Sequence, residues 1–373
     1  MSPQRKLRLL VIGPTPPPYH GVATFIRDLL NTSSSKVELL HVDTSDRRDA
    51  ENIGRWDGEN LRIGFSNLAE LAARLVRENI DCVYVPISQN IPAFARDALF
   101  ILEARARGCR VVVQLHGGYF RTLYDQAPAA FQSLARAALN SAAAVIVLGE
   151  GFRPIFSGIV PESRIHVVEN GVPDSGAWAL RQNNRSEIPR VLYMSTLTRT
   201  KGILDLIEAV ALVREKQPLQ LRIAGAWADA EIERDGRLLI ENLKMQEFIE
   251  FAGTVDGASK TAFLSAGEVF CLPTRYAYEG QPLVLLEAMA AGLPVVSTRH
   301  GVIGSTVVDG QTGLLLPKEF QPRELAASIE ALLQDESRRT SMGEAARQRY
   351  LQNYTLESCH GRLLDLVAQV CDA

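Results

Sequence analysis

Residues Tyr278–Val296 read YEGQPLVLLEAMAAGLPVV and set out a turn, a helix and a strand in succession. Gly280 and Pro282 mark a turn that enters a helix at its first positions. The apolar run over 282–291 predicts that helix, and the run over 294–297 predicts a buried strand. A helix joined to a buried strand in this way is typical of proteins with a parallel sheet.

The same alternation extends through the second half of the chain. Short apolar runs rich in branched residues predict strands, and the stretches between them predict helices. The predicted strands are Arg190–Met194, Leu219–Ala224, Phe248–Ala252, Val269–Leu272 and Pro294–Ser297, with short ones at Ser305–Val308 and Leu314–Leu316. The predicted helices are Ile203–Lys216, Arg237–Met245, Lys260–Ser265, Pro282–Ala291 and Arg323–Gln334, and the tail from Ser337 is helical with a break near Asn353.

The first half of the chain repeats the pattern. Its predicted strands are Leu7–Gly13, Val37–Val42, Cys82–Pro86, Arg110–Leu115, Ala144–Leu148 and Ile165–Val168, and its predicted helices are Asn67–Asn79, Ala93–Arg107 and Ala129–Asn140, with another starting near Val22. Strands that alternate with helices in this way form parallel sheets covered on both faces.

The polar, turn-rich segment 173–189 separates the two series and predicts a linker. A chain of 373 residues also exceeds the size at which single cores stop growing. We therefore expect one domain over 1–172 and a second over 190–352, with the last helix, about 353–373, packing back on the first domain. The predicted fold class is α/β, with two Rossmann-like, doubly wound domains that face a cleft, where ligands bind at the carboxyl ends of the strands.

Composition excludes several classes of protein. Forty Lys and Arg against forty-three Asp and Glu give a net charge of −3, whereas a dedicated nucleic-acid binder shows a basic excess. No apolar run approaches the ~20 residues of a membrane span. The basic and apolar N-terminus resembles a signal peptide superficially, but its apolar core is short and runs into prolines, which favours a buried strand. Five widely spaced cysteines without a Cys-x-x-Cys pair indicate reduced thiols in a cytoplasmic protein.

Two carboxylates stand out in the opening segment. Glu279 lies in the loop before the predicted helix, and Glu287 lies within it. The free backbone N–H groups at 281–284, together with the helix dipole, form a seat for a phosphate. The alternative is that Glu279 complements the dipole and that Glu287 is a solvated helix residue.

Three further loops follow predicted strands. The first, Tyr193–Gly202 (YMSTLTRTKG), ends in Lys-Gly, where a cation can meet a diphosphate, or where two cations are merely solvated. The second, Gly13–Ala23 (GPTPPPYHGVA), is stiffened by prolines and lacks the glycine fingerprint of nicotinamide dinucleotide sites. The third, Val111–Phe120 (VVVQLHGGYF), places His116 at the carboxyl end of a buried strand.

Together these motifs resemble the signature of the retaining glycosyltransferases of family 4 (group 1), which have the GT-B fold. That family includes sucrose-phosphate synthases and many bacterial polysaccharide transferases. It carries Glu-x7-Glu within EGFP-type sequence, followed by LEAMA-G-PVV. Here Gln281 replaces the commoner Phe, a change that should tune the sugar site.

The resemblance implies donor-binding roles in the second domain. Glu279 would act as a catalytic residue beside the transferred sugar, and Glu287 would bind the ribose hydroxyls. Lys201 matches the family's lysine, but Ser195 and Thr196 replace its Gly-Arg, which leaves Arg199 as the candidate guanidinium for the diphosphate. The remaining donor-binding candidates are Ser195 itself, Gly280, Gln281, Pro282, Leu283, and Val255 in a turn (Phe251–Lys260) that resembles the family's base-recognition turn.

In the first domain, the resemblance implies that His116 contacts the transferred sugar as a second catalytic residue and that Gly21 faces the donor phosphates. His20 and Gly117 belong to the acceptor or phosphate loops, although His20 could equally be an exposed loop histidine. Asn170, in VVENGVP, is either a turn former at positive φ or a ligand contact.

The implied function is retaining transfer of a sugar from a nucleoside-diphosphate sugar, UDP- or GDP-linked, to an acceptor hydroxyl in bacterial cell-surface polysaccharide or glycolipid synthesis. The sequence has no Asp-x-Asp motif and no zinc-type cluster, so we expect no metal and no cofactor. Two alternatives stay open: a non-hydrolysing nucleotide-sugar epimerase, and a non-catalytic sugar-nucleotide sensor or scaffold.

The expected partners are the donor and a carbohydrate or lipid-linked acceptor, with no nucleic acid. The expected location is the cytoplasm, with peripheral contact at the inner face of the membrane as an option. The basic stretch Phe94–Arg110 is the candidate membrane surface, or else an ordinary solvated helix face.

Overall fold

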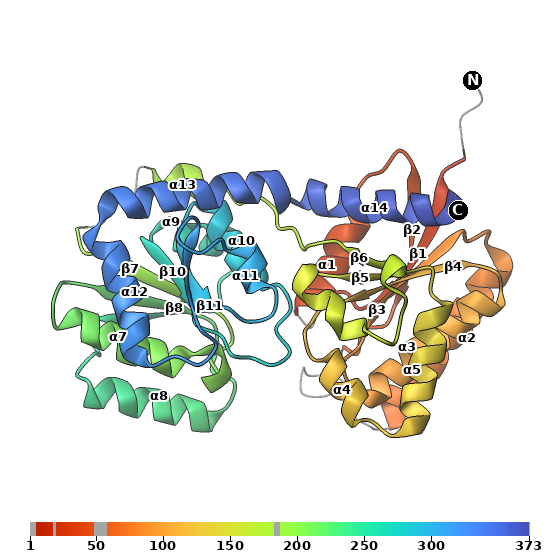
Figure 1. Cartoon of the computed structure of the whole chain (residues 1–373), viewed down its shortest axis with the longest axis horizontal. Helices are drawn as coiled ribbons and strands as arrows, with labels where there is room; N and C mark the ends of the chain where they lie inside the picture. Colours follow the sequence, from red (N-terminus) through yellow and green to blue (C-terminus); the bar gives the residue numbers. More distant parts are fainter. Residues whose placement is uncertain (1–4, 18–19, 48–57, 183–186, 373) are drawn as a thin grey trace. The chain divides into compact units, whose positions relative to one another are not determined.

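The computed structural model describes residues 5–17, 20–47, 58–182 and 187–372. Their contacts divide the chain into two compact units. Unit 1 runs to Asn170 and also contains the chain from Leu356 onward, whereas unit 2 is Gly171–Thr355. Each unit has its own six-stranded sheet flanked by helices (Figure 1). The predicted α/β fold class with two doubly wound domains is therefore confirmed.

Unit 1 has a parallel sheet of strand order β2-β1-β3-β4-β5-β6. Its strands are β1 (Leu7–Gly13), β2 (Val37–Asp43), β3 (Cys82–Ile87), β4 (Arg110–Leu115), β5 (Ala144–Val147) and β6 (Ile165–Val167). Its helices are α1 (Gly21–Leu30), α2 (Gly58–Arg77), α3 (Ile91–Ala106), α4 (Phe120–Gln126), α5 (Ala129–Ser141) and α14 (Leu356–Asp372), with 3-10 turns η2 (Glu150–Phe156) and η3 (Glu162–Arg164).

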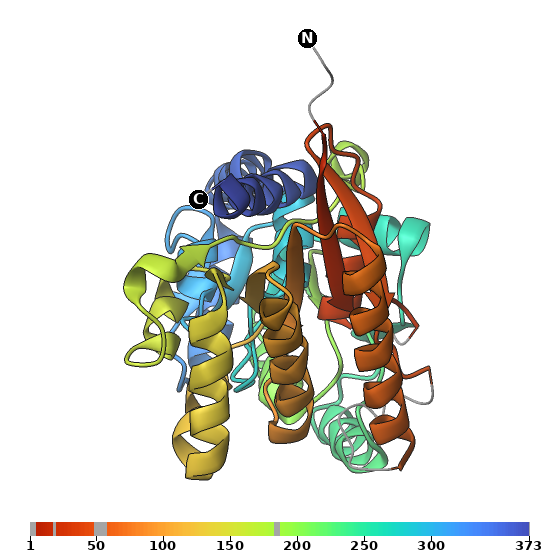
Figure 2. The ribbon, with the colours of Figure 1, turned by 90° about the vertical axis from the view of Figure 1, so that its right-hand side faces the viewer.

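Strand β1 shows how this sheet is covered. Leu9 and Val11 lie on the face that packs against α1 and α14, where Ile26 and Leu363 belong to the same buried cluster. Since side chains alternate along a strand, Leu10 and its even-numbered neighbours point to the opposite face. Helices α2, α3 and α5 run side by side in Figure 2, and α3 packs on β3 and β4.

Unit 2 has a parallel sheet of strand order β12-β11-β10-β7-β8-β9. Its strands are β7 (Arg190–Met194), β8 (Gln220–Ala224), β9 (Ile249–Gly253), β10 (Val269–Leu272), β11 (Val295–Thr298) and β12 (Gly313–Leu316). Its helices are α6 (Ala177–Arg181), α7 (Ile203–Arg214), α8 (Ala230–Asn242), α9 (Gly257–Ser265), α10 (Leu283–Ala290), α11 (Ile303–Thr306), α12 (Pro322–Gln334) and α13 (Glu336–Asn353), with the 3-10 turn η4 (Arg199–Lys201).

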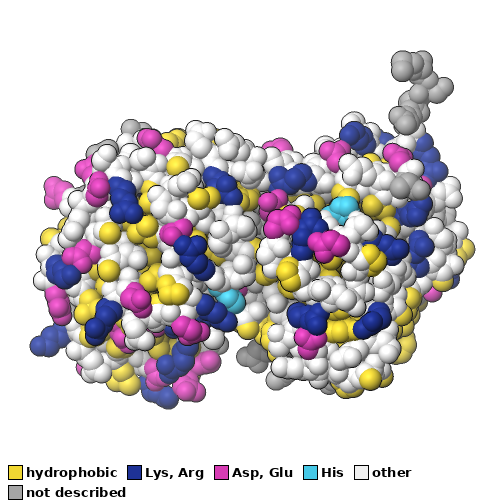
Figure 3. Space-filling view, viewed as in Figure 1, with side chains coloured by type: hydrophobic (Ala, Val, Ile, Leu, Met, Phe, Trp, Pro, Cys, Tyr) yellow, Lys and Arg dark blue, Asp and Glu magenta, His cyan; other side chains and the backbone are white. Residues whose placement is uncertain are grey.

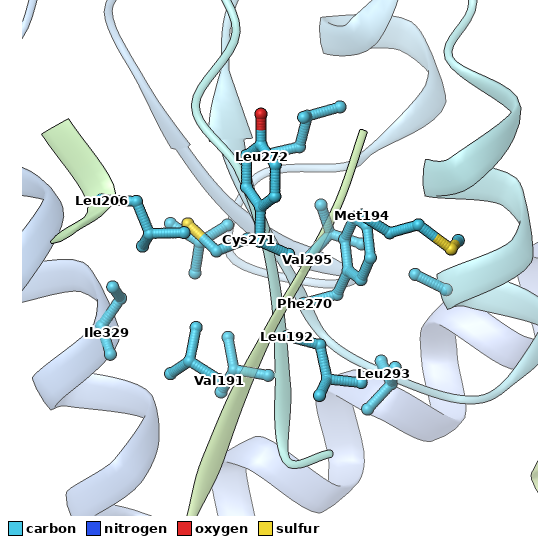
Figure 4. Close-up of a cluster of buried hydrophobic side chains, with 14 of the residues drawn as sticks. Val191, Leu192, Met194, Leu206, Phe270, Cys271, Leu272, Leu293, Val295 and Ile329 are labelled. Atoms are coloured by element: carbon cyan, nitrogen blue, oxygen red, sulfur yellow. The ribbon is translucent and has the colours of Figure 1, made fainter. Parts of the chain in front are cut away.

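The two central strands of unit 2 are buried on both faces. In Figure 4, Val191 and Cys271 point toward Leu206 of α7, whereas Leu192 and Phe270 point to the other side of the sheet. Strands buried on both faces read as unbroken apolar runs. This is why the sequence predicts β7 and β10 at their observed bounds.

One predicted strand is wrong. Residues 305–308 were expected to be extended, but the segment contributes to the short helix α11. The amides of Thr306 and Val307 donate to the carbonyls of Val302 and Ile303 at 3.0 and 2.8 Å, respectively. All four residues are buried, and so short an apolar segment carries no period that separates strand from helix.

Helix α8 begins seven residues before its predicted start. Asp229 caps it by accepting hydrogen bonds from the amides of Glu231 and Ile232, both at 2.9 Å. An aspartate before the helix is an ordinary start signal, but the charged first turns hide the apolar period.

The segment expected to be a linker belongs to unit 2 over its described residues, and residues 183–186 lie outside them. Helix α6 packs on α9, and Ala177 is buried. The ring of Trp178 lies against Gly292, where a Cβ would come within 2.1 Å of it. The chain therefore enters unit 2 before the first strand of that unit.

The surface charges are mixed in sign (Figure 3), and the cysteines form no disulfide among the described residues. Charged side chains of both signs are interspersed over the face drawn in Figure 3. All five cysteines are free, and four of them are buried. Within the ranges that the structure describes, no helix has the length and hydropathy to cross a membrane.

Candidate functional site

The donor-site candidates of unit 2 lie where its strand order reverses. From β7 the chain proceeds to β8 and β9 on one side, and then returns to β10, next to β7, before continuing to β11 and β12. Loops at the carboxyl ends of two such strands diverge, and ligands bind at this point in open α/β sheets. The two loops are Ser195–Gly202 after β7 and Pro273–Pro282 after β10.

Backbone contacts join these loops. The amide of Arg275 donates to the carbonyl of Thr200 at 2.7 Å. Gly202 has a φ of +77°, and a Cβ at this position would lie 2.3 Å from the carbonyl oxygen of Pro273. Glycine thus serves both the left-handed conformation and the close approach. It sets the neighbouring Lys201 directly beside the β10 loop.

We expect Gly202→Ala to destabilise the protein and to displace Lys201. The matched control is Gly158→Ala, since Gly158 has a φ of +70° but open space around its Cβ position. The control should lower the free energy of unfolding by about 1–2 kcal/mol through φ alone. The clash at Gly202 should make the loss of Tm at least twice that of the control, and it should weaken nucleotide binding. Thermal unfolding of both variants measures this, and equal losses would contradict the close approach.

The central contact of the site joins Lys201 to Glu279. The Nζ of Lys201 lies 2.6 Å from Oε2 of Glu279, and the hydroxyl of Thr274 donates to the same oxygen at 2.8 Å. The exposed fraction of the side chain is 17% for Lys201 and 8% for Glu279. The ammonium also lies 4.8 Å from the centre of the Tyr276 ring. Low exposure strengthens such a charge pair and makes each partner costly to leave alone.

Helix α10 begins next to this pair. Pro282 is its N-cap and no side chain caps the helix, so its first N–H groups have no partner within it. Glu287 lies in the helix, and its Oε1 is 2.8 Å from Nζ of Lys260 in α9. The helix thus places its first backbone N–H groups near Lys201, and it carries a second paired carboxylate further along.

Gln281 and Arg199 are held by neighbouring elements. The buried amide of Gln281 donates to the hydroxyl of Thr306 in α11 at 3.0 Å, which ties the β10 loop to that helix. The exposed guanidinium of Arg199 pairs with Asp235 in α8. A phosphate would have to draw Arg199 away from Asp235.

The other donor-site candidates lie around the same edge of the sheet. Gly280 and Pro282 are buried beside Glu279, and Leu283 is the first residue of α10. Ser195 lies close to Gly225 after β8, where a Cβ would fall 1.9 Å from the Ser195 carbonyl oxygen. Val255 lies further along the sheet, in the loop between β9 and α9.

In unit 1, His20 is a structural part of α1 as well as a site candidate. It is the N-cap of the helix, and its Nδ1 accepts a hydrogen bond from the amide of Ala23 at 3.3 Å. Burial lowers the pKa of His20. Gly21, the next residue, is exposed, and a Cβ there would meet nothing within 4 Å among the described residues. Residues 18–19 of the proline-rich loop lie outside the described residues.

His116 follows β4 and is half-buried. Its ring centre lies 4.8 Å from that of Phe25, and its Nε2 lies 3.1 Å from the hydroxyl of Tyr84. Burial, and to a lesser extent the nearby His20, lower the pKa of His116 to about 3. This shift favours the neutral form of the imidazole. The buried Gly117 follows it directly.

Asn170, the last residue of the first part of unit 1, is buried. The positive-φ alternative for it is wrong, because Lys244 is the one non-glycine residue with positive φ among those that the structure describes.

Several partners of the predicted residues could not be identified from the sequence. Thr274 and Tyr276 precede Glu279 in its own loop, and Lys260 pairs with Glu287. Tyr84 lies within a predicted strand. A polar residue inside an apolar run is the one signal that could have indicated Tyr84. The contact of Thr274 depends on how its loop folds, and those of Tyr276 and Lys260 depend on which segments the sheet brings together.

Two family profiles match the chain in succession. The profile described as "Glycosyl transferase 4-like domain" matches residues 14–171, and "Glycosyl transferases group 1" matches residues 178–349. Together they span both units over most of the described chain.

Curated relatives include the alpha-D-kanosaminyltransferase of Streptomyces kanamyceticus, 28% identical over 72% of this chain and 73% of the relative. The GDP-mannose:cellobiosyl-diphosphopolyprenol alpha-mannosyltransferase of Xanthomonas campestris is 28% identical over 69% of this chain and 67% of its own length. Among solved structures, Anabaena HepE in complex with UDP-glucose is 15% identical and aligns with a TM-score of 0.72 over 97% of this chain and 99% of HepE.

Proposed function

Because this chain belongs to the group 1 glycosyltransferases with the GT-B fold, we propose that it moves a sugar from a nucleoside-diphosphate sugar to an acceptor hydroxyl with retention of anomeric configuration. Sugar transfer itself follows from the family. The observation that carries the finer proposal is the low-exposure contact of Lys201 with Glu279 at the strand-order reversal of unit 2.

The donor lies against unit 2 in this proposal. Lys201 and the uncapped N-terminus of α10 offer positive charge and N–H donors to the diphosphate. Glu287, already paired with Lys260, accepts hydrogen bonds from the ribose hydroxyls. UDP and GDP are the favoured nucleoside diphosphates of the donor, since HepE is solved with UDP-glucose and the Xanthomonas relative is named for GDP-mannose.

Transfer proceeds in the proposal by attack on the face that the diphosphate leaves. The bond between the anomeric carbon and the phosphate oxygen breaks, the acceptor oxygen bonds to that carbon, and its proton passes to the leaving phosphate. Lys201 stabilises the departing charge, and Glu279 stabilises the positive charge that develops on the sugar. These protein groups suffice in the proposal, so no resident metal is required.

The acceptor is a carbohydrate or a lipid-linked saccharide in this proposal, held by unit 1 near His116. The diphosphopolyprenol acceptor in the name of the Xanthomonas relative supports a lipid carrier, and thus a cytoplasmic protein at the inner face of the membrane. Helix α3 does not supply the membrane surface in the proposal. Arginines in and just after this helix are engaged within unit 1: Arg96 with Asp97, Arg105 with the carbonyl of Cys109, and Arg107 with Glu103.

The test is a thermal-shift panel of UDP-, GDP-, ADP-, dTDP- and CMP-sugars with and without EDTA. A ligand that binds the native state raises Tm by mass action. We expect a clear shift with a UDP- or GDP-sugar that EDTA leaves unchanged, and NMR of the product should show the anomeric configuration of the donor. Loss of the shift with EDTA would contradict the metal-independent proposal.

Donor turnover separates the alternatives. An epimerase would convert the donor without an acceptor, and a sensor would bind it without forming any product. Either result would overturn the proposed transfer reaction of the site.

A further inference from the structure

Three polar side chains form a linked group in unit 1, one from the middle of β3 and two from the carboxyl end of β4 and the loop after it. The hydroxyl of Tyr84 lies 2.6 Å from Oε1 of Gln114 and 3.1 Å from Nε2 of His116. Tyr84 and Gln114 are fully buried, and Phe25 packs against the rings of both Tyr84 and His116. Tyr84 and Gln114 have no direct part in the proposed reaction, so they can affect it only through His116.

The distances assign the direction of the two hydrogen bonds. A separation of 2.6 Å is typical of O–H···O and shorter than usual for N–H···O. Tyr84 therefore donates its proton to the carbonyl oxygen of Gln114. The hydroxyl has one proton, so its oxygen can only accept from His116. The ring proton of His116 then lies on Nε2, and Nδ1 carries the lone pair.

His20, in the same unit, is also the Nε2–H tautomer, but the nitrogen that it uses within the protein is Nδ1. Its Nδ1 is used to accept from Ala23, so its ring proton lies on Nε2 and is available to a ligand oxygen. His116 uses its Nε2 proton inside the protein and presents an acceptor instead. Unit 1 thus offers one imidazole donor, at His20, and one imidazole acceptor, at His116.

We propose that Tyr84, oriented by Gln114, is a positioning residue that holds His116 as the Nε2–H tautomer, so that Nδ1 accepts a hydrogen bond from a hydroxyl of the bound sugar. The tautomer follows from the contacts within unit 1, and only the identification of the partner as a sugar hydroxyl rests on the proposed function. A neutral, unprotonated Nδ1 favours a hydroxyl over a phosphate oxygen, because a phosphate oxygen has no proton to donate at neutral pH.

Maintaining this group costs stability. Nε2 of Gln114 is buried and has no hydrogen-bond partner among the described residues. An unsatisfied buried amide is unfavourable, whereas an apolar side chain of similar size would carry no such penalty. The presence of a glutamine at this buried position is thus explained by its carbonyl, which orients the hydroxyl of Tyr84.

The test reads the tautomer directly. Long-range ¹H–¹⁵N correlation spectra of the full chain with ¹⁵N-labelled histidine separate the two neutral forms, and His116→Gln assigns the signals among the six histidines. We expect wild-type His116 as the Nε2–H form. Tyr84→Phe should produce a mixture of both tautomers. Gln114→Leu should shift the population toward Nδ1–H, because the freed Tyr84 proton then turns to Nε2.

Tyr124→Phe is the matched control. Tyr124 is also buried in unit 1, and its hydroxyl accepts from Arg136 at 2.9 Å. Tyr124→Phe should leave the His116 signals unchanged. A wild-type Nδ1–H form, or unchanged signals in both Tyr84→Phe and Gln114→Leu, would overturn the proposal.

Kinetics then connect the tautomer to the sugar. Tyr84→Phe and Gln114→Leu should each lower kcat/KM roughly tenfold, the value of one hydrogen bond of about 1.4 kcal/mol. Tyr124→Phe should keep the wild-type value. A changed tautomer with unchanged kcat/KM would overturn the sugar contact but keep the positioning role. If no sugar nucleotide is turned over at all, the proposed function fails, while the spectra still decide the tautomer.

Discussion

Glu279→Gln is expected to lower kcat by about 10²–10³-fold while the affinity for the nucleoside diphosphate changes little. The substitution keeps the size of the side chain and an oxygen for the hydroxyl of Thr274, and it removes only the charge. A preorganised charge at the reacting centre contributes in this range because it interacts most strongly with the transition state. Steady-state kinetics give kcat, and calorimetric titration with UDP or GDP gives the affinity.

The control for this variant is Glu250→Gln. Glu250 lies in β9 and pairs with Arg222 at 2.6 Å, but its side chain is 55% exposed. It should retain wild-type turnover. If Glu279→Gln also retained it, Glu279 would have no role in the transferred sugar's chemistry, and its contact with Lys201 would be structural only.

Lys201→Ala is expected to weaken binding of both the nucleoside diphosphate and the intact donor, by roughly 10–100-fold for loss of one charge-assisted contact. It should also destabilise the protein by about 3–5 kcal/mol, since it leaves the carboxylate of Glu279 in a low-exposure site without its cation. Calorimetry measures the first effect and thermal unfolding the second.

A double variant separates these effects. Lys201→Ala combined with Glu279→Gln removes both charges, so it should recover much of the lost stability but none of the lost affinity. Lys216→Ala is the control, because Lys216 pairs with Glu330 at an exposed position and should change stability by less than about 1 kcal/mol. Equal affinity of Lys201→Ala and wild type for both ligands would show that the phosphates bind elsewhere.

The elements that the sequence predicts best are those buried on both faces. Strands β1, β4, β7 and β10 have their predicted bounds because each is a largely apolar run of strand length. Helix α11 was mistaken for a strand, since a buried helix of four residues has no period of its own. The start of α8 was missed because its first turns are charged.

The candidate residues divide in the same way. Glu279, Glu287 and Lys201 could be selected from the chain because they accompany turn residues and helix starts within short segments. Tyr84 could not, because its side-chain partners come from another strand and the loop after it, and Thr274 could not, because its contact with Glu279 depends on how their shared loop folds. Gln281 and Arg199 were expected in the donor site, yet each has a partner on a neighbouring helix.

By itself the sequence determined the alternation of strands and helices, the two sheets and the loops that carry the candidate residues, because apolar period and turn chemistry are local properties. Only the tertiary structure decided that Lys201 meets Glu279, 78 residues away, and that Tyr84 meets His116. These contacts depend on which strands are neighbours. Strand order is set by the packing of the whole sheet, so it cannot be read from any single segment.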